Sequence, residues 1–345
     1  MNFYDYRVSK VLKESKNISS YYLKPLNGDL LPSFLPGQFI TVKIHLKGQD
    51  KAVTRNYTLS DKPGMDYYRI TVKKEPKGLV STFLHDEISV GSRLKVSAPS
   101  GNFYLSQGMD TPVVMISGGV GITPMMSMIE YIAEHQPQRK VYFYHSSKNK
   151  DLQPMGERLK KLSSKNGNIN LYVHHTQPLE NEIRGVNYDE STIIDLNHFK
   201  KNIKEIEQCS FYICGPVSFM HDMSNHLTAM GVAKNKINFE RFDNPDRINI
   251  QNTSIVQTNT EEPEVYFLKS GLKTFWNIKH ENLLTLAESL GIEAPSSCRM
   301  GTCASCETEI HSGETVYEPE PFVEARPGNV FICCAKPKTH ITLNL

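Results

Sequence analysis

Five of the seven cysteines lie within the last 50 residues, and three of these follow an ordered C-x4-C-x2-C spacing. The three are Cys298, Cys303 and Cys306. An adjacent pair, Cys333 and Cys334, comes much later in the chain. A binuclear [2Fe-2S] cluster needs four thiolates, two on each iron, and this spacing suits a loop that wraps around such a cluster. Small residues within the loop would let backbone amides hydrogen-bond the sulfurs. They are Gly301, Ala304 and Ser305.

Only one cysteine of the adjacent pair should reach a cluster, because neighbouring residues of a strand point to opposite faces. Zinc is the alternative metal, but an adjacent pair makes a poor tetrahedral chelate. The C-x4-C-x2-C spacing is similar to that of plant-type ferredoxins, and Val330–Pro337 resembles the closing strand of that family. In the family the ligand cysteine lies four residues before a proline, and this resemblance selects Cys333 as the fourth ligand.

A guanidinium, an aromatic ring and two hydroxyls follow one another in Arg55-Asn56-Tyr57-Thr58-Leu59-Ser60. Arginine can pair with a diphosphate through its fork of donors. A phenol can lie against a flavin ring, and a hydroxyl can hydrogen-bond the flavin nitrogen that accepts hydride. Further along, Gly78 opens a G-x-x-S segment that ends at Ser81, where a glycine and a helix start can bind phosphate. An ordinary edge strand and a helix capped by Ser81 are the simpler interpretations.

A glycine-rich segment, Ser117–Pro124, follows an apolar run and opens a helical segment. Such a turn suits a pyrophosphate, because the backbone can come close and the helix end is positive. Cys214-Gly215-Pro216 ends another apolar run, and ligands bind at the carboxyl edge of parallel strands. Taken alone, Cys214 is more simply a small buried residue. Phe239-Glu240-Arg241-Phe242 closes this part of the chain, where a final strand with one exposed charge is the simpler interpretation.

In this order the motifs resemble those of the ferredoxin-NADP reductase superfamily. The sequence around Ser60–Pro63 and Tyr68–Lys73 is most similar to the reductase half of flavohaemoglobins. The resemblance implies that FAD is the flavin and that Arg55 and Ser81 contact its pyrophosphate. It also implies FAD contacts from a further set of residues. They are Phe39, Tyr57, Thr58, Leu59, Ser60, Thr71, Val72, Gly78 and Val80, with Tyr57 and Thr58 beside the isoalloxazine and Phe39 near it.

The same resemblance implies the nicotinamide site. Cys214 would lie near the reactive nicotinamide carbon, with Met220 covering the site. Glu240 would tune the flavin potential, and Phe242 would cover the flavin until the nicotinamide arrives. The expected catalytic residues are Thr58, Cys214 and Glu240. The expected dinucleotide contacts are Gly118, Gly119, Val120, Gly121, Ile122, Thr123, Cys214, Gly215 and Pro216.

Three modules must position these motifs. Short alternating strands with Pro and Gly turns predict an antiparallel β-barrel over residues 1–108, which would bind FAD. Continuous apolar runs between helical segments predict an α/β nucleotide domain with a parallel sheet over 109–245. The polar segment 246–262 is interpreted as a linker. The ferredoxin resemblance implies an α+β domain of the β-grasp type over 263–345, and so a multidomain chain.

Strands and helices within these modules can be placed from the same patterns. Strands are expected, among others, over Gln38–Ile44, Tyr68–Lys73, Pro112–Ile116, Lys140–Tyr144 and Ser210–Cys214. Helices are expected over Pro124–Ala133 and Asn282–Leu290, the second ended by Gly291.

Composition narrows the class of protein. A length of 345 residues suggests two or three domains. The net charge of +2, without a Lys/Arg block, argues against a nucleic-acid partner. The most apolar stretch, Val113–Ile122, is too short to span a bilayer. The polar first residues lack the features of a signal peptide, so a cytoplasmic protein is expected.

Together the motifs predict an NAD(P)H-dependent reductase that passes electrons through FAD and a [2Fe-2S] cluster to a partner protein. NADH is favoured because His145–Asn149 lacks an arginine for a 2′-phosphate, although Lys148 leaves NADPH open. The acceptor would dock beside the Cys298–Cys306 loop, with Arg299 as a contact. The resemblance to oxygenase reductases implies an oxygenase, a desaturase or a hybrid-cluster-type protein as this acceptor.

Other functions remain open from the sequence. A non-enzymatic iron–sulfur carrier or redox sensor would leave the two nucleotide-type motifs without a purpose. The electron-transfer subunit of a dehydrogenase combines the same cofactors. A nitric-oxide dioxygenase would need a globin domain before the barrel, whereas this sequence begins directly in barrel-like strands.

Overall fold

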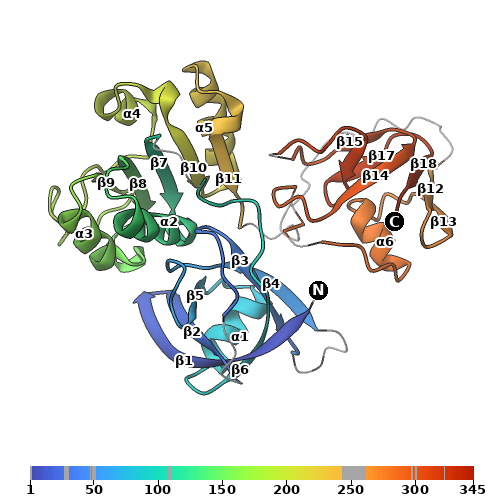
Figure 1. Ribbon diagram of the computed structural model, residues 1–345, viewed down its shortest axis with the longest axis horizontal. Coiled ribbons are helices and arrows are strands. Elements are labelled where there is room, and N and C mark those ends of the chain that lie inside the picture. Colours follow the sequence, from blue (N-terminus) through green and yellow to red (C-terminus); the bar gives the residue numbers. More distant parts are fainter. Residues whose placement is uncertain are drawn as a thin grey trace. The chain divides into compact units, whose positions relative to one another are not determined.

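The computed structural model describes all residues except 1, 27–30, 47, 49–51, 107–110, 243–261, 297, 300 and 322. The chain divides into two compact units, Met1–Phe242 and Asp243–Leu345. Figure 1 shows both units coloured along the chain. The predicted linker, 246–262, lies outside the described residues apart from residue 262.

An antiparallel six-stranded sheet forms the first part of the larger unit (Figure 1). Its strands, in the order β4-β3-β6-β1-β2-β5, are β1 (Phe3–Ser15), β2 (Ile18–Pro25), β3 (Phe39–Ile44), β4 (Val53–Thr58), β5 (Tyr68–Lys73) and β6 (Arg93–Ser97). Leu59, just after β4, bridges Ile70 in β5, and this contact brings the two edges of the sheet together. Helix α1 (Leu79–Glu87) packs on the enclosed apolar core through Val80 and Leu84.

A parallel five-stranded sheet forms the second part of the larger unit. In the order β11-β10-β7-β8-β9, its strands are β7 (Val113–Gly118), β8 (Val141–Ser147), β9 (Ile169–His175), β10 (Ser210–Cys214) and β11 (Ile237–Glu240). The helices between and after them are α2 (Ile122–His135), α3 (Gly156–Lys165), α4 (Leu196–Asn202) and α5 (Val217–Ala229). Short 3₁₀ turns are η1 (Gly119–Gly121), η2 (Lys150–Leu152), η3 (Ile206–Gln208) and η4 (Lys234–Lys236).

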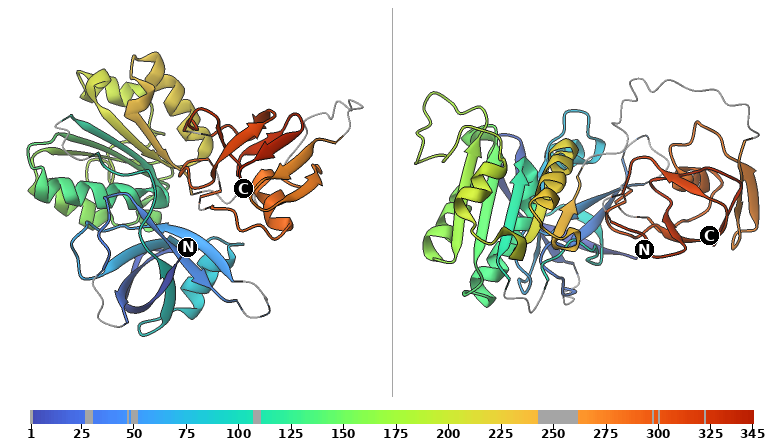
Figure 2. Two further views of the ribbon diagram at one scale, coloured as in Figure 1. Left: turned by 45° about the vertical axis from the view of Figure 1, so that its right-hand side comes forward. Right: turned by 90° about the horizontal axis from the view of Figure 1, so that it is seen from above.

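Helices cover both faces of this parallel sheet (Figures 1 and 2). Met115 and Phe143 share an apolar core with α2 and α3. The next residue of β8, Tyr144, points the other way and stacks edge-on against Phe199 of α4, with ring centroids 4.9 Å apart. Burial on both faces explains why β7 is a continuous apolar run rather than an alternating one.

The smaller unit contains a mixed five-stranded sheet in the order β13-β12-β18-β14-β16 and a separate pair, β15-β17. Its elements are β12 (Glu264–Phe267), β13 (Leu272–Phe275), α6 (Leu283–Ser289), β14 (Glu307–Ser312), β15 (Thr315–Tyr317), β16 (Asn329–Phe331), β17 (Ala335–Pro337) and β18 (Ile341–Leu343). Asn282 and Thr285 form a capping box that starts α6. Leu283, Leu284, Leu286 and Ala287 then bury this helix against the sheet.

The three sheets confirm the predicted fold class. The strands expected over Tyr68–Lys73 and Ser210–Cys214 match β5 and β10 residue for residue. One local prediction is wrong: Ser81 does not cap α1, because the helix already begins at Leu79 with Gly78 as its N-cap residue. In the described part of the chain, no helix has the length and apolar character needed to cross a membrane.

The expected closing strand also differs from the structure. The segment from Ile332 to Cys334 is a turn between β16 and β17, so strand alternation does not separate Cys333 from Cys334. The cause lies in the pairing partners, since β16 pairs with β14 whereas β17 pairs with β15. The chain must turn to change partner at this point.

Candidate redox centres

The predicted dinucleotide motifs meet where the strand order of the parallel sheet reverses. The chain runs from β7 through β8 to β9 on one side, and β10 and β11 lie on the other. Ligands of such sheets bind at the carboxyl ends of the strands beside this reversal. The glycine-rich loop follows β7, and Cys214–Pro216 follows β10, so both motifs lie at this point. A methyl group placed on Gly215 would lie 3.6 Å from the amide nitrogen of Gly118.

Gly121 lies in the closest contact between the two loops. A methyl group on it would lie 2.4 Å from the carbonyl oxygen of Cys214 and 3.1 Å from its Sγ. The strand register places Cys214 between Ser117 on β7 and Glu240 on β11. Helix α2 starts directly after Gly121 without a side-chain cap. Its first amides can therefore serve an anion such as a pyrophosphate.

Two of the three expected catalytic residues are in direct contact. The Thr58 hydroxyl donates to Glu240 Oε2 at 3.0 Å, and both side chains are buried. Because Thr58 ends β4 and Glu240 ends β11, this bond joins the antiparallel sheet to the parallel one. Glu240 accepts the hydrogen bond of the Thr58 hydroxyl, and the lone pairs of the Thr58 oxygen stay available to a donor on a bound flavin.

We expect Thr58→Val to slow NADH-dependent flavin reduction about 10- to 100-fold, because losing the bond frees the strand that aligns donor and acceptor. Thr41→Val is the matched control, since Thr41 is equally buried and its hydroxyl donates to Asn56 Oδ1 at 2.8 Å. Stopped-flow absorbance at saturating NADH measures the rate. Equal rates for the two variants would show that the Thr58–Glu240 bond has no catalytic role.

Five of the residues expected to contact FAD have side chains that are buried within the barrel. Leu59, Val72 and Val80 are buried in the barrel core. The Ser60 and Thr71 hydroxyls lie 2.8 Å from each other and are also buried. These five side chains therefore make their contacts within the protein. The contacts that these residues are expected to make with FAD would come from their backbone atoms.

Arg55 and Tyr57, both on β4, are partly exposed, and Tyr57 also packs against the barrel core. Burial raises the pKa of the Tyr57 phenol, while the neighbouring Arg55 guanidinium opposes this rise. The phenol therefore stays protonated, and the guanidinium stays close to it. A planar ring and a diphosphate are the groups that such a pair suits.

The G-x-x-S segment is compact. A methyl group on Gly78 would lie 2.3 Å from Ser81 Oγ, so glycine is required for the serine to approach. Ser81 Oγ accepts from the Glu75 amide at 3.2 Å. Gly78 and Ser81, both expected to contact FAD, thus lie together at the start of α1.

Three further expected residues differ in exposure. Phe39 is buried, and its ring lies against Gly101, where a methyl group would be 2.7 Å from the ring. Met220, in the first turn of α5, is fully buried. Phe242 is 40% exposed directly after β11, as expected for an aromatic ring that can move aside. The roles of all three in binding stay predictions.

A buried histidine supports the glycine-rich loop. His145 Nδ1 lies 2.8 Å from Oγ of Ser117, the residue before Gly118. Burial, together with the neighbouring His175 and His174, lowers the pKa of His145 to about 3. Unfolded histidine binds a proton near pH 6.5. The contribution of neutral His145 to stability is therefore complete above about pH 6.5 and is lost as the pH falls toward 3.

His145→Asn should consequently move the acid-unfolding midpoint of the protein to lower pH, because asparagine keeps a polar atom near Ser117 and does not titrate. Circular dichroism between pH 7 and pH 3 measures this midpoint. His45→Asn provides the control, since His45 is exposed. A midpoint that His145→Asn leaves unchanged would contradict the buried-histidine account.

The cysteine loop turns its amides toward sulfur. Three of its residues have left-handed backbone conformations: Arg299, Gly301 and Ala304, with φ of 57°, 65° and 56°. The amides of Thr302 and Cys303 donate to Cys298 Sγ at 3.4 and 3.3 Å. The Gly301 amide donates to Cys333 Sγ at 3.3 Å. Such donors stabilise thiolates and metal-bound sulfur.

The four predicted iron ligands interact with one another. The Cys333 thiol is hydrogen-bonded to those of Cys298, Cys306 and Cys334, and the Cys303 thiol to that of Cys298. These bonds, with burial, raise the pKa of Cys333 and Cys303. Four thiolates so close would repel one another without a cation, and an iron cluster supplies that charge. In the described residues the side chains are not grouped as a site for a single metal ion.

Gly301 distinguishes the two adjacent cysteines. Its amide faces Cys333, whereas a methyl group on it would lie 2.8 Å from Cys334 Sγ and 2.7 Å from Cβ of Pro321. Cys334 therefore packs against the Cα of the loop rather than against its amides, and it is buried. We keep Cys333 as the proposed fourth ligand.

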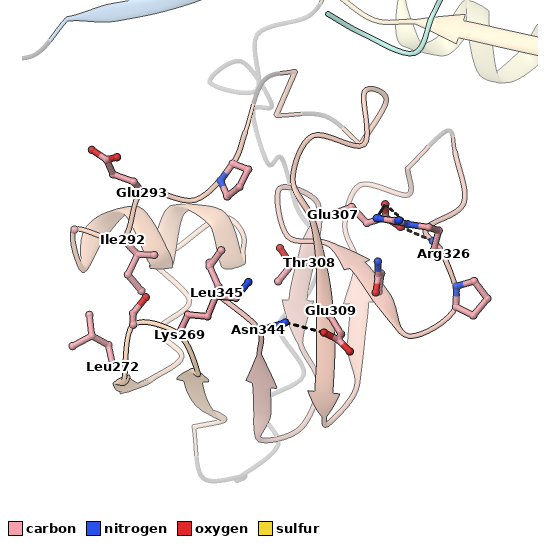
Figure 3. Close-up of a pocket in the computed structure, with 15 residues that line it drawn as sticks. Lys269, Leu272, Ile292, Glu293, Glu307, Thr308, Glu309, Arg326, Asn344 and Leu345 are labelled. Atoms are coloured by element: carbon pink, nitrogen blue, oxygen red, sulfur yellow. Dashed lines mark hydrogen bonds and ion pairs between the residues drawn. The ribbon is translucent and has the colours of Figure 1, made fainter. Parts of the chain in front are cut away.

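An open groove on the smaller unit is lined by residues of β14, the strand that follows the cysteine loop (Figure 3). Glu307, the residue after Cys306, lines it and forms an ion pair with Arg326 at 2.9 Å. Further along, Asn344 donates to Glu309 Oε2 at 2.8 Å. The groove therefore presents polar groups within one residue of a predicted ligand.

Three family models match the chain. The oxidoreductase FAD-binding domain matches residues 5–104, the oxidoreductase NAD-binding domain 115–225, and the 2Fe-2S iron-sulfur cluster binding domain 270–338. These ranges lie inside the predicted modules, whose boundaries stay predictions. The chain therefore contains FAD-binding and NAD-binding domains of the oxidoreductase type and a [2Fe-2S] cluster binding domain.

The flavohemoprotein of Bacillus cereus is 41% identical over 246 residues, which are 70% of this chain and 61% of that protein. Flavohemoprotein A of Dictyostelium discoideum is 36% identical over 248 residues, which are 69% and 60% of the two chains. The chain thus spans about three fifths of these curated relatives. It belongs to the ferredoxin-NADP reductase family, with a flavohemoprotein-like reductase part and a C-terminal [2Fe-2S] ferredoxin domain.

Solved structures extend the likeness to all three domains. Phthalate dioxygenase reductase matches with a TM-score of 0.63 at 23% identity, over 99% of this chain and 98% of that one. An intact type IV self-sufficient cytochrome P450 monooxygenase matches with a TM-score of 0.73 at 20% identity, over 99% and 41%. The FAD/NAD-binding domain of nitric oxide dioxygenase from Vibrio cholerae matches with 0.63 at 29% identity, over 70% and 99%. At these identities the first two show a shared fold.

One group of interacting residues was not predicted from the sequence. Asp61, Arg69 and Arg158 form a buried ionic cluster between the two sheets of the larger unit. Asp61 and Arg158 are 97 residues apart in the chain, and no local pattern links them. Only a buried charge next to the FAD strand could have drawn attention to Asp61.

Proposed function

We propose that this protein takes electrons from NADH and passes them singly to a separate redox protein, with an oxygenase as the leading class of acceptor. A desaturase or a hybrid-cluster-type protein is the further choice. The observation that carries the proposal is that one chain joins the motifs expected to bind nicotinamide and flavin to a group of four neighbouring thiols. A flavin can accept an electron pair and release it in single steps to an iron–sulfur cluster.

The likeness to reductases of oxygenases favours this class of acceptor. Phthalate dioxygenase reductase is described as a modular structure for electron transfer from pyridine nucleotides to [2Fe-2S]. The cytochrome P450 monooxygenase contains the same three-domain fold as part of a longer chain. Both names refer to oxygenase systems, and both likenesses cover 99% of this chain.

Electrons would leave through the cysteine loop of the smaller unit. Cys298 is partly exposed, whereas Cys303, Cys306 and Cys333 are buried, so the edge at Cys298 is nearest to solvent. Arg299, expected to contact the acceptor, donates to Glu288 Oε2 at 2.9 Å. The acceptor would therefore meet an ion pair here rather than a lone guanidinium. All seven cysteines are free of disulfides, which fits the reducing cytoplasm that we propose as the location.

NADH is the proposed coenzyme. The loop after β8 carries Lys148, which is exposed, and no arginine. The loop after β9 holds it in place, since the Gln177 amide donates to the Lys148 carbonyl at 2.7 Å. The Lys150 amide also donates to Glu182 Oε1 at 2.7 Å. Lys148 and Lys150, both in this loop, give a 2′-phosphate less than the bidentate contact that an arginine provides. A higher kcat/KM for NADPH than for NADH would contradict this choice.

Electron exit through the cluster can be tested with cytochrome c as a one-electron protein acceptor. The wild-type protein should reduce cytochrome c with NADH. Cys298→Ser should lose most of this activity, yet should still reduce ferricyanide, which small-molecule access to the flavin allows. Unchanged cytochrome c reduction by Cys298→Ser would show that electrons leave from the flavin, and the proposed route would be wrong.

A further inference from the structure

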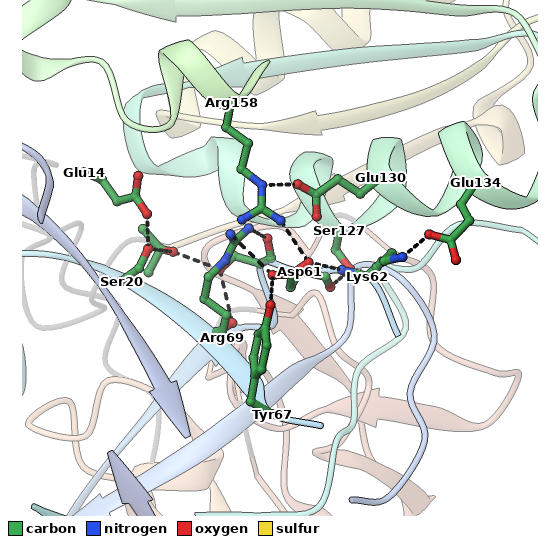
Figure 4. A network of polar contacts seen from close by, with 12 residues as sticks. Glu14, Ser20, Asp61, Lys62, Tyr67, Arg69, Ser127, Glu130, Glu134 and Arg158 are labelled. Atoms are coloured by element: carbon green, nitrogen blue, oxygen red, sulfur yellow. Dashed lines mark hydrogen bonds and ion pairs between the residues drawn. The ribbon is translucent and has the colours of Figure 1, made fainter. Parts of the chain in front are cut away.

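A buried ionic cluster lies between the two sheets of the larger unit (Figure 4). The Asp61 side chain is 3% exposed and that of Arg69 is fully buried. Arg69 Nη1 lies 3.4 Å from Asp61 Oδ2, and Arg158 Nη2 lies 3.1 Å from Asp61 Oδ1. The Tyr67 hydroxyl also donates to Asp61 Oδ2 at 3.0 Å. The Asp61 carboxylate thus forms ion pairs with one arginine from the antiparallel-sheet part of the unit and one from the parallel-sheet part.

Helix α2 is attached to the same residue. The Ser127 hydroxyl donates to the Asp61 backbone carbonyl at 2.7 Å, and Glu130, one turn further, accepts from Arg158 Nε. Burial, and then Asp61, raise the pKa of Glu130 to about 9. Arg158 contacts both of these carboxyl groups, as Figure 4 shows.

The cluster is close to both halves of the redox site. Asp61 comes three residues after Thr58, and Arg69 Nε donates to Ser60 Oγ at 3.1 Å. On the other side, Ser127 lies in the helix that starts at the glycine-rich loop. The cluster therefore joins the expected FAD strand to the helix expected to bind the dinucleotide pyrophosphate.

Apolar packing also holds helix α2 against the antiparallel-sheet part of the unit. We call this contact region, together with the Asp61 cluster, the joint. A methyl group on Gly37 would lie 2.5 Å from Cε of Met128, the residue after Ser127. Helix α2 thus rests directly on the backbone at the start of β3.

Arg158 is 40% exposed, but its carboxyl partners Asp61 and Glu130 are only 3% and 8% exposed. In the nearby ion pair of Lys62 with Glu134, the carboxylate itself is 51% exposed. Water screens an exposed pair, whereas a buried pair keeps its geometry.

We propose that Asp61 is a positioning residue for electron transfer from the nicotinamide to the flavin. With Arg69 and Arg158 it holds helix α2 at a set distance from the FAD strand. Transfer between two bound rings depends steeply on their alignment, and a misplacement of about 1 Å can slow a reaction about 100-fold. The inference rests on the proposed sites for FAD and NADH, and it adds a group that touches neither.

Two variants test the proposal from opposite sides of the joint. Asp61→Asn removes the central charge, and Arg158→Gln removes a partly exposed partner that belongs to the parallel-sheet part. Lys62→Gln is the control, because it removes an ion pair to the same helix at the edge of the joint. Each full-length variant is measured for FAD content, for cluster absorption and for flavin reduction at saturating NADH. Hydrogen exchange of α2 is measured without NADH.

We expect Asp61→Asn and Arg158→Gln to retain FAD and the cluster, and to reduce flavin about tenfold or more slowly at saturating NADH. Amides of α2 should exchange faster in both variants, which a purely local effect on the flavin would not cause. The double variant should be little slower than either single one, because both remove the same joint. Lys62→Gln should behave as the wild type.

Other results would overturn the proposal. If Arg158→Gln shows wild-type reduction and wild-type exchange, the cluster does not position α2. This result decides the question even if Asp61→Asn loses FAD or fails to fold, since Asp61 would then serve the barrel alone. A wild-type protein that NADH does not reduce would instead contradict the proposed function, while the exchange measurement would still report on the joint.

Discussion

The Cys333→Ser substitution is expected to abolish the iron–sulfur absorption of the protein, whereas Cys334→Ser should leave it intact. Cys333 Sγ accepts a hydrogen bond from the Gly301 amide and is hydrogen-bonded to the thiols of Cys298 and Cys306. Cys334 Sγ instead packs against the Cα side of Gly301. A cluster that loses one of four thiolates loses a bond to iron, and a hydroxyl is a poor replacement.

Visible absorption and electron paramagnetic resonance of the reduced proteins measure the cluster, and iron and sulfide analysis give its content. FAD content and NADH-dependent flavin reduction should stay near wild type in Cys333→Ser, because the flavin site lies in the other unit. The pair is its own control, since both cysteines are buried and adjacent. A cluster that survives in Cys333→Ser and disappears in Cys334→Ser would reverse the assignment.

Gly121→Ala should slow the reduction of the flavin by NADH about 100-fold. A methyl group at this position would lie 2.4 Å from the Cys214 carbonyl oxygen, which is backbone and cannot rotate away. The loop after β7 and the loop after β10 would have to separate, and the start of α2 would move with the first. Reduction by dithionite should be unaffected, because it does not need the dinucleotide site.

The matched control for this substitution is Gly167→Ala. Gly167 lies in the same domain, between α3 and β9, and a methyl group there would meet no atom within 4 Å. Stopped-flow reduction and the dissociation constant for NAD⁺ separate slower transfer from weaker binding. Wild-type values for both in Gly121→Ala would mean that the dinucleotide does not use the contact between these loops.

The sequence was most informative where the signal is local. The apolar run at Val113–Ile116 predicted a strand buried on both faces, because helices cover both sides of a parallel sheet. The strand-end motifs at Gly118 and Cys214 could be paired in advance, since carboxyl ends of parallel strands share one edge. The C-x4-C-x2-C spacing likewise pointed to a [2Fe-2S] domain, and the family model confirms that domain.

Contacts between distant segments could not be predicted in this way. The Thr58–Glu240 bond joins residues 182 positions apart, and the resemblance implied roles for both without implying a bond. Asp61 lies in a segment that was noted only for its family resemblance, although two arginines surround it in the fold. The turn at Cys333 was missed because Val330–Ala335 is a continuous apolar run like a buried strand, while the change of pairing partner from β14 to β15 is set by tertiary structure.

The central claim is that NADH reduces both the flavin and the [2Fe-2S] cluster of this one chain. An anaerobic titration of the full-length protein with NADH, followed by visible absorption, tests it most directly. We predict that flavin and iron–sulfur absorption both bleach, and that the cluster signal appears in electron paramagnetic resonance. Bleaching of the flavin alone, with a cluster that dithionite can still reduce, would contradict the internal route from NADH to the cluster.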